Sequence, residues 1–205
     1  MKKFKSAIKG FTLVELLIVI GLLGAIALIV ISAINPIEQA NRARDTRYKA
    51  DGGQLISAID RYFVGASAYP WMNIGTPITT TVDASFGFRT ASGEEIGICG
   101  ADCTTDGLLT NTNELKTEFR NRDFISSTEA TEQLMIGKGT GSSESVYACF
   151  VPLSKSVREK ACTAGKVYEI ATDETGARTP VADPADCAAD ATGWADTPLY
   201  ICIPE

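Results

Sequence analysis

The sequence contains no histidine in its 205 residues. Without an imidazole the chain cannot build a Ser-His-Asp triad, a Cys-His dyad or a histidine zinc ligand, and it lacks the commonest general base. Paired carboxylates or a lysine could still support catalysis. The composition nevertheless favours a protein that is not an enzyme.

Basic side chains are scarce beyond the first ten residues. Four of the 19 Lys and Arg residues lie in residues 1–10, which hold no acid, so residues 11–205 carry 15 basic and 25 acidic side chains, a net charge of −10. A nucleic-acid-binding face needs clustered positive charge. The short basic cluster at residues 42–49 is interleaved with Asp45, and we interpret it as a contact for lipid headgroups or an acidic neighbour. We expect no nucleic-acid partner for this chain alone.

One long apolar run, residues 11–34, contains a single charged residue, Glu15. As a helix it would span roughly 36 Å, enough to cross a hydrocarbon core of about 30 Å. The run is also longer than the apolar core of a secretory signal peptide, and the basic segment before it is typical of the cytoplasmic side. We therefore predict a transmembrane helix over residues 11–35.

The carboxylate of Glu15 lies four residues inside this apolar run. A lone carboxylate in lipid costs several kcal/mol unless it is neutralised or paired, so its position indicates a function. The residues around it, Gly10-Phe11-Thr12-Leu13-Val14-Glu15, follow a lysine-rich leader and precede the apolar helix. This segment resembles the processing signal of type IV prepilins and type II secretion pseudopilins.

The resemblance implies a role for each residue of the motif. A prepilin peptidase would cut after Gly10, discard residues 1–10 as a leader, and methylate the new amino group of Phe11. Glu15 would pair with the amino terminus of a neighbouring subunit in the filament core, since two buried charges are tolerated only as partners. Thr12 would belong to the same assembly region, with a bond to backbone as the alternative role of its hydroxyl.

The resemblance also implies partners and a location. The chain would lie in the bacterial inner membrane as a single-pass protein before assembly, and in an extracellular pilus on the cell surface afterwards. Its partners would be other pilin subunits in a homo-oligomeric filament, the prepilin peptidase, and the pilus assembly platform with its ATPase. We expect a structural subunit of a type IV pilus; the alternatives are a type II secretion pseudopilin, or a minor pilin or membrane-tethered adhesin that binds an external ligand.

Glycine and proline interrupt the apolar helix and its outer end. Gly21 and Gly24 lie within it, and Pro36 follows Asn35 where it leaves the membrane. Proline removes a backbone donor and clashes one turn back, which predicts a kink near residues 32–36. In related filaments a Gly/Pro region of the first helix loosens on assembly; close helix packing in the membrane is the alternative role of the glycines.

Residues 36–66 change to an amphipathic pattern that continues the helix. Apolar residues recur in steps of four and three on one face, with Gly52-Gly53 as a local weak point. This face consists of Tyr48, Gly52, Leu55, Ile59 and Tyr62. Charged residues are expected on the remaining surface: Arg42, Arg44, Asp45, Arg47, Lys49, Asp51, Asp60 and Arg61.

Residues 67–205 read as a loop-rich head. Short apolar runs between Pro, Gly, Ser and Asp predict strands at 145–152, 166–172 and 198–204, with 77–88 as an edge strand or loop. Residues 113–124 and 127–136 are expected to hold short helical turns. The predicted fold is α+β: a long N-terminal helix packed on a small antiparallel sheet with disulfide-linked loops.

Six cysteines follow the apolar segment: Cys99, Cys103, Cys149, Cys162, Cys187 and Cys202. An even number of exported cysteines predicts disulfides. Cys99 and Cys103 can close a tight loop. For the other four cysteines two pairings are open. If Cys187 bonds to Cys202, then Cys149 and Cys162 are left to pair with each other. The rival is a bond between Cys149 and Cys202 across paired strands. A zinc site is disfavoured because paired CxxC knuckles are lacking.

An acid-rich stretch near the C-terminus offers oxygen ligands for Ca²⁺, with Asp183, Asp186 and Asp190 as the candidates. Major pseudopilins, which the chain resembles, have a calcium site in their C-terminal loop. The spacing matches no EF-hand, however, and loops are commonly acidic for solubility. We expect no other cofactor and no other metal.

Overall fold

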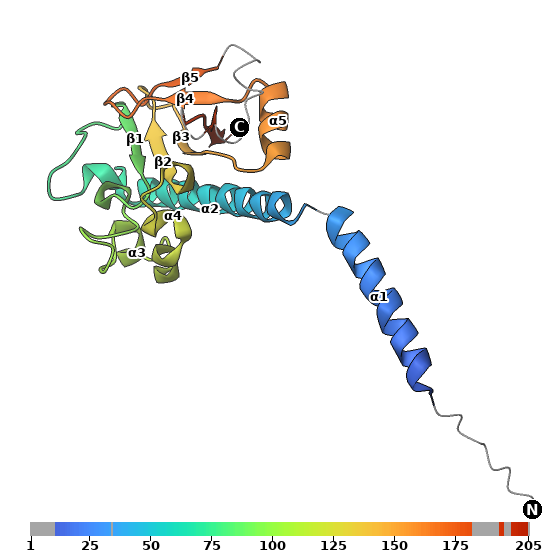
Figure 1. Cartoon of the computed structure of the whole chain (residues 1–205). Helices are drawn as coiled ribbons and strands as arrows, with labels where there is room; N and C mark the ends of the chain where they lie inside the picture. The colour runs from blue at the N-terminus through green and yellow to red at the C-terminus, as the bar shows by residue number, and fades with distance from the viewer. Residues whose placement is uncertain (1–10, 34, 182–192, 195–197, 205) are drawn as a thin grey trace, which may run out of the picture. The chain divides into compact units, whose positions relative to one another are not determined.

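The computed structural model describes residues 11–33, 35–181, 193–194 and 198–204, and the chain divides into two compact units at Gln39–Ala40. The described part of the chain starts with two helical segments, α1 (Leu13–Ala33) and α2 (Pro36–Ala66) (Figure 1). The expected transmembrane and amphipathic parts of the N-terminal helix correspond to these two segments. Helix α1 passes through both of its glycines without interruption.

The start of α2 follows from its first residues. Pro36 occupies the first helical position, where its missing N–H would have had no intrahelical partner. The Asn35 side-chain Oδ1 accepts a hydrogen bond from the Glu38 backbone N–H at 3.2 Å, and its carbonyl accepts from the Gln39 N–H at 3.3 Å. Asn35 therefore caps α2, so a new helix begins here.

Four strands form the main sheet of the second unit, in the order β1-β2-β3-β6 with every neighbouring pair antiparallel. Their bounds are β1 Phe86–Thr90, β2 Leu134–Lys138, β3 Val146–Phe150 and β6 Ile201–Ile203. A second, two-stranded sheet pairs β4 (Tyr168–Ile170) with β5 (Arg178–Pro180). The α+β class predicted from the sequence is confirmed.

Short helices fill the connections between these strands. Their bounds are η1 Pro70–Met72, η2 Glu94–Ile96, α3 Leu108–Asn111, η3 Thr117–Asn121, α4 Asp123–Ser126, η4 Ala130–Glu132 and α5 Lys155–Thr163. Helix α5 is the longest of them, and the Ser154 Oγ caps it by accepting from the Val157 N–H at 3.4 Å.

One face of α2 packs against the main sheet, as Figure 1 shows. All five residues predicted for that face are buried. Gly52 lies so near β3 that a Cβ on it would approach the Ala148 Cβ at 3.1 Å and the Ile203 Cδ1 at 3.2 Å. No atom lies within 4 Å of a Cβ placed on Gly53. Gly52 is therefore a site of close helix–sheet approach rather than a weak point of the helix.

The opposite face of the sheet is covered by a second apolar cluster. Strand alternation divides the side chains, so Leu134 and Ile136 join the cluster around α2, whereas Met135 joins the second cluster. Trp194 and Tyr200 also belong to this second cluster. The sheet is thus a buried middle layer between α2 and the chain that follows β3.

The disulfides decide between the pairings that the sequence left open. Cys99 bonds to Cys103, as expected, and Cys149 forms the rival pairing with Cys202 rather than bonding to Cys162. The reason is register: β3 and β6 are neighbours and place these two residues opposite each other, with their Cα atoms 4.0 Å apart. Cys162 is also disulfide-bonded. Cys187 lies outside the described residues.

The strand predictions are confirmed at β3, β4 and β6, with shorter bounds than expected. The prediction of helical turns over residues 127–136 is wrong for residues 134–136, because residues 134–138 form the central strand β2. The edge strand expected within 77–88 begins only at Phe86 and continues to Thr90. Strand β5 and helix α5 were not predicted.

The contact at Gly52 generates a prediction. Leucine at position 52 cannot fit against β3, so Gly52→Leu should lower the free energy of unfolding by about 1–3 kcal/mol. The matched variant Gly53→Leu should be neutral or slightly stabilising, because leucine has the better helix propensity. Chemical denaturation of the full chain in detergent micelles, followed by tryptophan fluorescence, measures both. Equal effects of the two substitutions would contradict the close approach.

Candidate functional site

The first turn of α1 is closed by two side chains that bond reciprocally. The Thr12 Oγ1 accepts from the Glu15 N–H at 3.2 Å, while the Glu15 Oε2 accepts from the Thr12 N–H at 2.9 Å and from its hydroxyl at 2.8 Å. This is a capping box, a motif that satisfies orphan donors at a helix start. Within the described residues the Oε1 of Glu15 accepts no hydrogen bond, which leaves half of the carboxylate available to another group.

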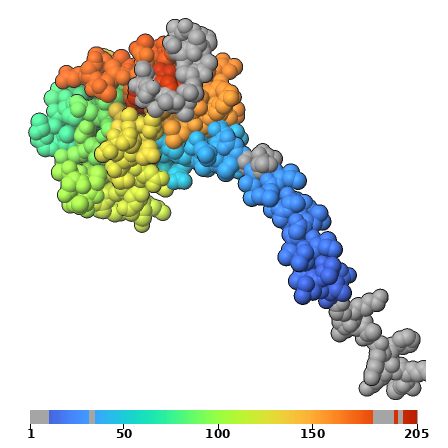
Figure 2. Space-filling model, viewed as in Figure 1, coloured from blue at the N-terminus to red at the C-terminus, as the bar shows by residue number. Residues whose placement is uncertain are grey.

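The sides of α1 are apolar all round. Fourteen large hydrophobic side chains of this helix are between 46% and 79% exposed. The segment that carries them is coloured blue in Figure 2. Leu13–Ile31 is long and apolar enough to cross a membrane, with a mean hydropathy of 3.0. Leaving these side chains in water would cost on the order of tens of kcal/mol, so α1 requires lipid or other protein around it.

The two glycines of α1 have no packing role among the residues that the structure describes. No atom lies within 4 Å of a Cβ placed on Gly21 or on Gly24. Glycine is unfavourable in a helix interior relative to alanine. The small size of these glycines therefore points to close helix packing against a partner outside the described part of this chain.

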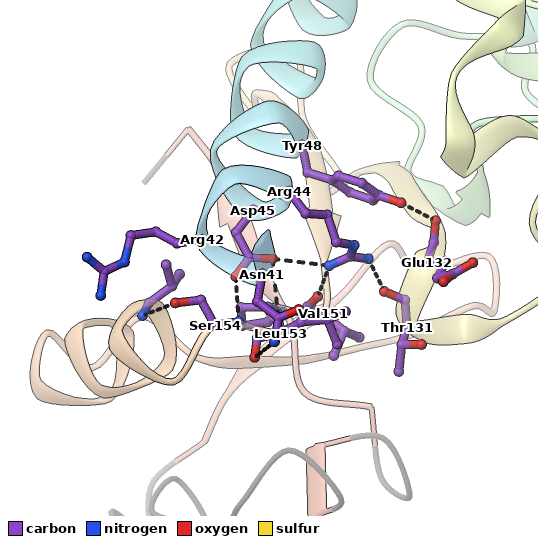
Figure 3. A network of polar contacts seen from close by, with 12 residues as sticks. Asn41, Arg42, Arg44, Asp45, Tyr48, Thr131, Glu132, Val151, Leu153 and Ser154 are labelled. Carbon is purple, nitrogen blue, oxygen red and sulfur yellow. Dashed lines mark hydrogen bonds and ion pairs between the residues drawn. The ribbon is translucent and has the colours of Figure 1, made fainter. Parts of the chain in front are cut away.

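A second polar site fixes the beginning of α2 to the loop between β3 and α5 (Figure 3). Asp45 is fully buried, and its two carboxylate oxygens accept the Leu153 N–H at 3.2 Å and the Ser154 N–H at 2.8 Å. Arg44 completes the pairing, with its Nη1 3.1 Å from the Asp45 Oδ1. The buried carboxylate thus has both backbone donors and an opposite charge.

Arg44 extends this network toward β2. Its Nη1 donates to the Val151 carbonyl at 3.1 Å, and its Nη2 donates to the Thr131 carbonyl. The guanidinium lies 4.0 Å from the ring centroid of Tyr48, whose hydroxyl donates to the Glu132 carbonyl at 2.7 Å. A single arginine therefore holds α2 against two separate loops, in part through a cation–π contact.

Burial sets the electrostatics of the two interior acids on α2. It raises the pKa of Asp45, against the lowering by the Ser154 and Leu153 N–H groups and by Arg44. Burial also raises the pKa of Asp51, which Arg122 and Arg47 partly offset. The Asp51 Oδ1 pairs with the Arg122 Nη2 at 3.2 Å, while its buried Oδ2 has no hydrogen-bond partner within the described residues.

The predicted site residues are found in several places. Phe11, Thr12, Glu15, Gly21 and Gly24 lie along the first unit, with Phe11 79% exposed. Gly10 lies outside the described residues, as do the calcium candidates Asp183, Asp186 and Asp190. In the described part of the chain, no group of three or more His, Cys, Asp or Glu side chains could hold a metal.

The expectation that Asp45 and Asp51 lie on the solvated surface is wrong. Asp45 lies three residues before Tyr48, so the apolar stripe of α2 extends by one step onto an acid. The basic cluster around it is divided: Arg44 points inward, whereas Arg47 pairs with Asp123 at 3.0 Å. Periodicity could have located Asp45, but its backbone donors, Leu153 and Ser154, lie more than a hundred positions away in the sequence.

Comparison with known proteins identifies a motif at the N-terminus. Residues 5–31 match the family model described as the prokaryotic N-terminal methylation motif. This is the signature of the prepilin-type signal of type IV pilins and pseudopilins. No curated protein and no solved structure matches the chain. The motif supports a type IV pilin-like or pseudopilin precursor.

Asp45 generates a stability prediction. Asp45→Ala would leave two buried N–H groups and the Arg44 charge without their partner, so the free energy of unfolding should fall by about 3–5 kcal/mol. The control Thr46→Ala removes an exposed hydroxyl on the same turn and should change it by less than about 0.5 kcal/mol. Denaturant titration of the full chain measures both. A loss below about 1 kcal/mol for Asp45→Ala would show that the network does not hold α2.

The raised pKa of Asp51 predicts a pH dependence. The folded chain keeps this carboxyl protonated to a higher pH than the unfolded chain, so the free energy of unfolding falls as pH rises from about 4 through the raised pKa. Asp51→Asn should flatten this fall. The control Asp102→Asn removes an acid whose pKa is lowered by hydrogen bonds from Thr104. Its contribution has the opposite sign and titrates below about pH 4, so this variant should leave the fall between pH 4 and 8 unchanged. Denaturation curves between pH 4 and 8 test both; a steeper fall in Asp51→Asn would contradict the assignment.

Proposed function

We propose that this protein is a structural subunit of a type IV pilus, cleaved after Gly10, methylated at Phe11 and assembled through α1. The observation that carries the proposal is the methylation motif placed directly on a helix with uncovered apolar sides. Such a helix can be covered by lipid before assembly and by the same helix of other subunits afterwards. The same apolar helix is stable in both environments, because lipid tails and a filament core are both apolar.

Glu15 supports the filament over a plain membrane anchor. An anchor needs only apolar residues, whereas this helix carries a carboxylate in its first turn with its Oε2 bonded to Thr12. In the proposed filament the remaining oxygen pairs with the methylated amino terminus of a neighbour. The pair would neutralise both charges inside the apolar core.

We favour a surface fibre over a secretion pseudopilus because the long insert and the disulfides of the head suit an exposed, mechanically stressed filament. The described part of the head holds two complete disulfides, one in the long insert between α2 and β2 and one across the sheet. Disulfides are typical of proteins that operate in oxidising surroundings. The alternatives are a pseudopilin, which would remain within the cell envelope, and a minor pilin or tethered adhesin, which would be scarce in sheared filaments.

Mass spectrometry of protein sheared from intact cells tests the proposal. The expected result is an abundant chain that begins at N-methylated Phe11 and is recovered in filaments. A chain that retains Met1–Gly10 and is found only in the membrane would refute processing and assembly. A processed chain found only in the periplasmic fraction would identify a pseudopilin instead.

Substitution separates the two roles of Glu15. Thr12→Ala removes the helix cap and should cost about 1 kcal/mol, with a modest effect on filaments. Glu15→Ala also strands the neighbour's buried amino group, at about 3–5 kcal/mol, and should reduce sheared filament at least about tenfold. Immunoblots of membrane and sheared fractions measure both variants. Equal filament yields would mean that Glu15 acts only as a cap.

A further inference from the structure

One arginine and two tyrosines form a cluster on the side of the head away from α2. Strand β5 supplies Arg178, β4 supplies Tyr168 and β3 supplies Tyr147. The small β4–β5 sheet packs through Tyr168 and Ile170 on the second apolar cluster, and Figure 1 shows it across the main sheet from α2. We refer to these three residues as the Arg178 cluster.

The two tyrosine rings hold the guanidinium in place. The Arg178 Cζ lies 3.3 Å from the ring centroid of Tyr147 and 5.1 Å from that of Tyr168. Strand register explains the second contact, because Arg178 is opposite Ile170 in β4 and Tyr168 is therefore its diagonal neighbour on the same face. A guanidinium stacked on aromatic rings loses little side-chain freedom when its N–H groups bind a partner.

The polar ends of this cluster are available to an outside group. Among the residues that the structure describes, neither the Arg178 guanidinium nor either tyrosine hydroxyl has a hydrogen-bond or ion-pair partner, and all three side chains are half-buried. Arginines beside α2 differ in this respect; Arg61, for example, pairs with Glu114 at 2.8 Å. The planar fork of free N–H groups on Arg178 matches the two oxygens of a carboxylate.

Carboxylates are the charged groups that this chain carries in excess. Residues 11–205 have a net charge of −10. In a filament of identical chains one surface of a head meets a different surface of the next head, so an arginine on one can pair with an acid on the other. Within the described part of the head, several exposed acids form no ion pair: Glu94, Glu118, Glu129, Glu144 and Glu174.

We propose that the Arg178 cluster binds a carboxylate on the head of a second copy of this chain. The inference rests on the proposed function, because filament assembly supplies the neighbouring head. Arginine and tyrosine dominate the energetics of protein interfaces where the surrounding contacts exclude water. An ion pair that is worth little on an open surface becomes stronger when a second head covers it. The filament thus gains a contact between heads in addition to the packing of α1.

Photo-crosslinking in cells tests this contact. p-Benzoylphenylalanine in place of Tyr168 keeps an aromatic ring beside Arg178 and bonds covalently to a neighbouring group on irradiation. The expected result is a crosslinked dimer of the full chain in the sheared fraction. Absence of the dimer from a fraction that contains filaments would overturn the cluster and leave the proposed function standing. A dimer found only in the membrane would keep the contact and refute the filament.

Substitution of the arginine tests its part in the contact. Arg178→Gln should reduce both the crosslinked dimer and the sheared filament about tenfold, because the neighbour's carboxylate loses its partner. Arg89→Gln is the matched control, since Arg89 is an exposed arginine of β1 with no ion pair or aromatic contact in the described residues. It should change both yields by less than about twofold.

Both variants should keep the denaturation midpoint of the unchanged chain in detergent, because neither arginine forms an ion pair within the described part of the head. Equal effects of the two substitutions on filament yield, or a dimer that persists undiminished in Arg178→Gln, would overturn the contact. If Arg178→Gln prevents folding, the crosslink formed beside the native arginine decides alone.

Discussion

The packing of α2 against the centre of the main sheet determines the form of the head. This contact is close because Gly52 presents only backbone to Ala148, and it buries the aromatic and aliphatic side chains of one helix face. At the N-terminal end of the same face, apolar packing gives way to the Asp45 network. Helix α2 is thus fixed by dispersion and hydrophobic burial along most of its length, and by charge-assisted hydrogen bonds where it leaves the first unit.

The uncovered sides of α1 connect this architecture to the proposed function. A soluble protein buries its apolar side chains in its own core, but α1 has none of its large hydrophobic side chains buried. The sequence therefore requires an environment that the isolated chain does not supply. Lipid and neighbouring subunits are two such environments.

Periodic features were predictable from the sequence, and features that depend on distant partners were not. The buried face of α2 followed from the spacing of five residues, and α1 from an unbroken apolar run. Strand β2 was missed because all five of its residues are buried, so no alternation marks it, and because it contains Lys138. That lysine is accommodated only because its Nζ donates to the Gly139 and Gly141 carbonyls at 3.1 and 2.6 Å.

Local signals for α5 were present, with Ser154 before the helix and Gly165 in a left-handed conformation after it. The sequence left the pairing of Cys149 with Cys202 open beside Cys149–Cys162, because the choice depends on the register of strands 53 residues apart in sequence. The Asp45 site combines both cases: periodicity marks its position on α2, whereas its backbone donors belong to a loop that only the folded chain brings near. From its residue type alone, Asp45 was predicted to be a solvent-exposed acid.

The position of β6 has a consequence for the order in which the head is completed. Residues 201–203 supply the last strand of the sheet, so a chain synthesised only as far as residue 200 leaves one edge of β3 with unpaired backbone groups. An open edge of this kind is a template for pairing with another chain. The Cys149–Cys202 bond then closes that edge covalently, so protection against aggregation comes only with residues 201–203 and an oxidising compartment. A chain that stops before residue 201 would accordingly give far less soluble head than the loss of one short strand suggests.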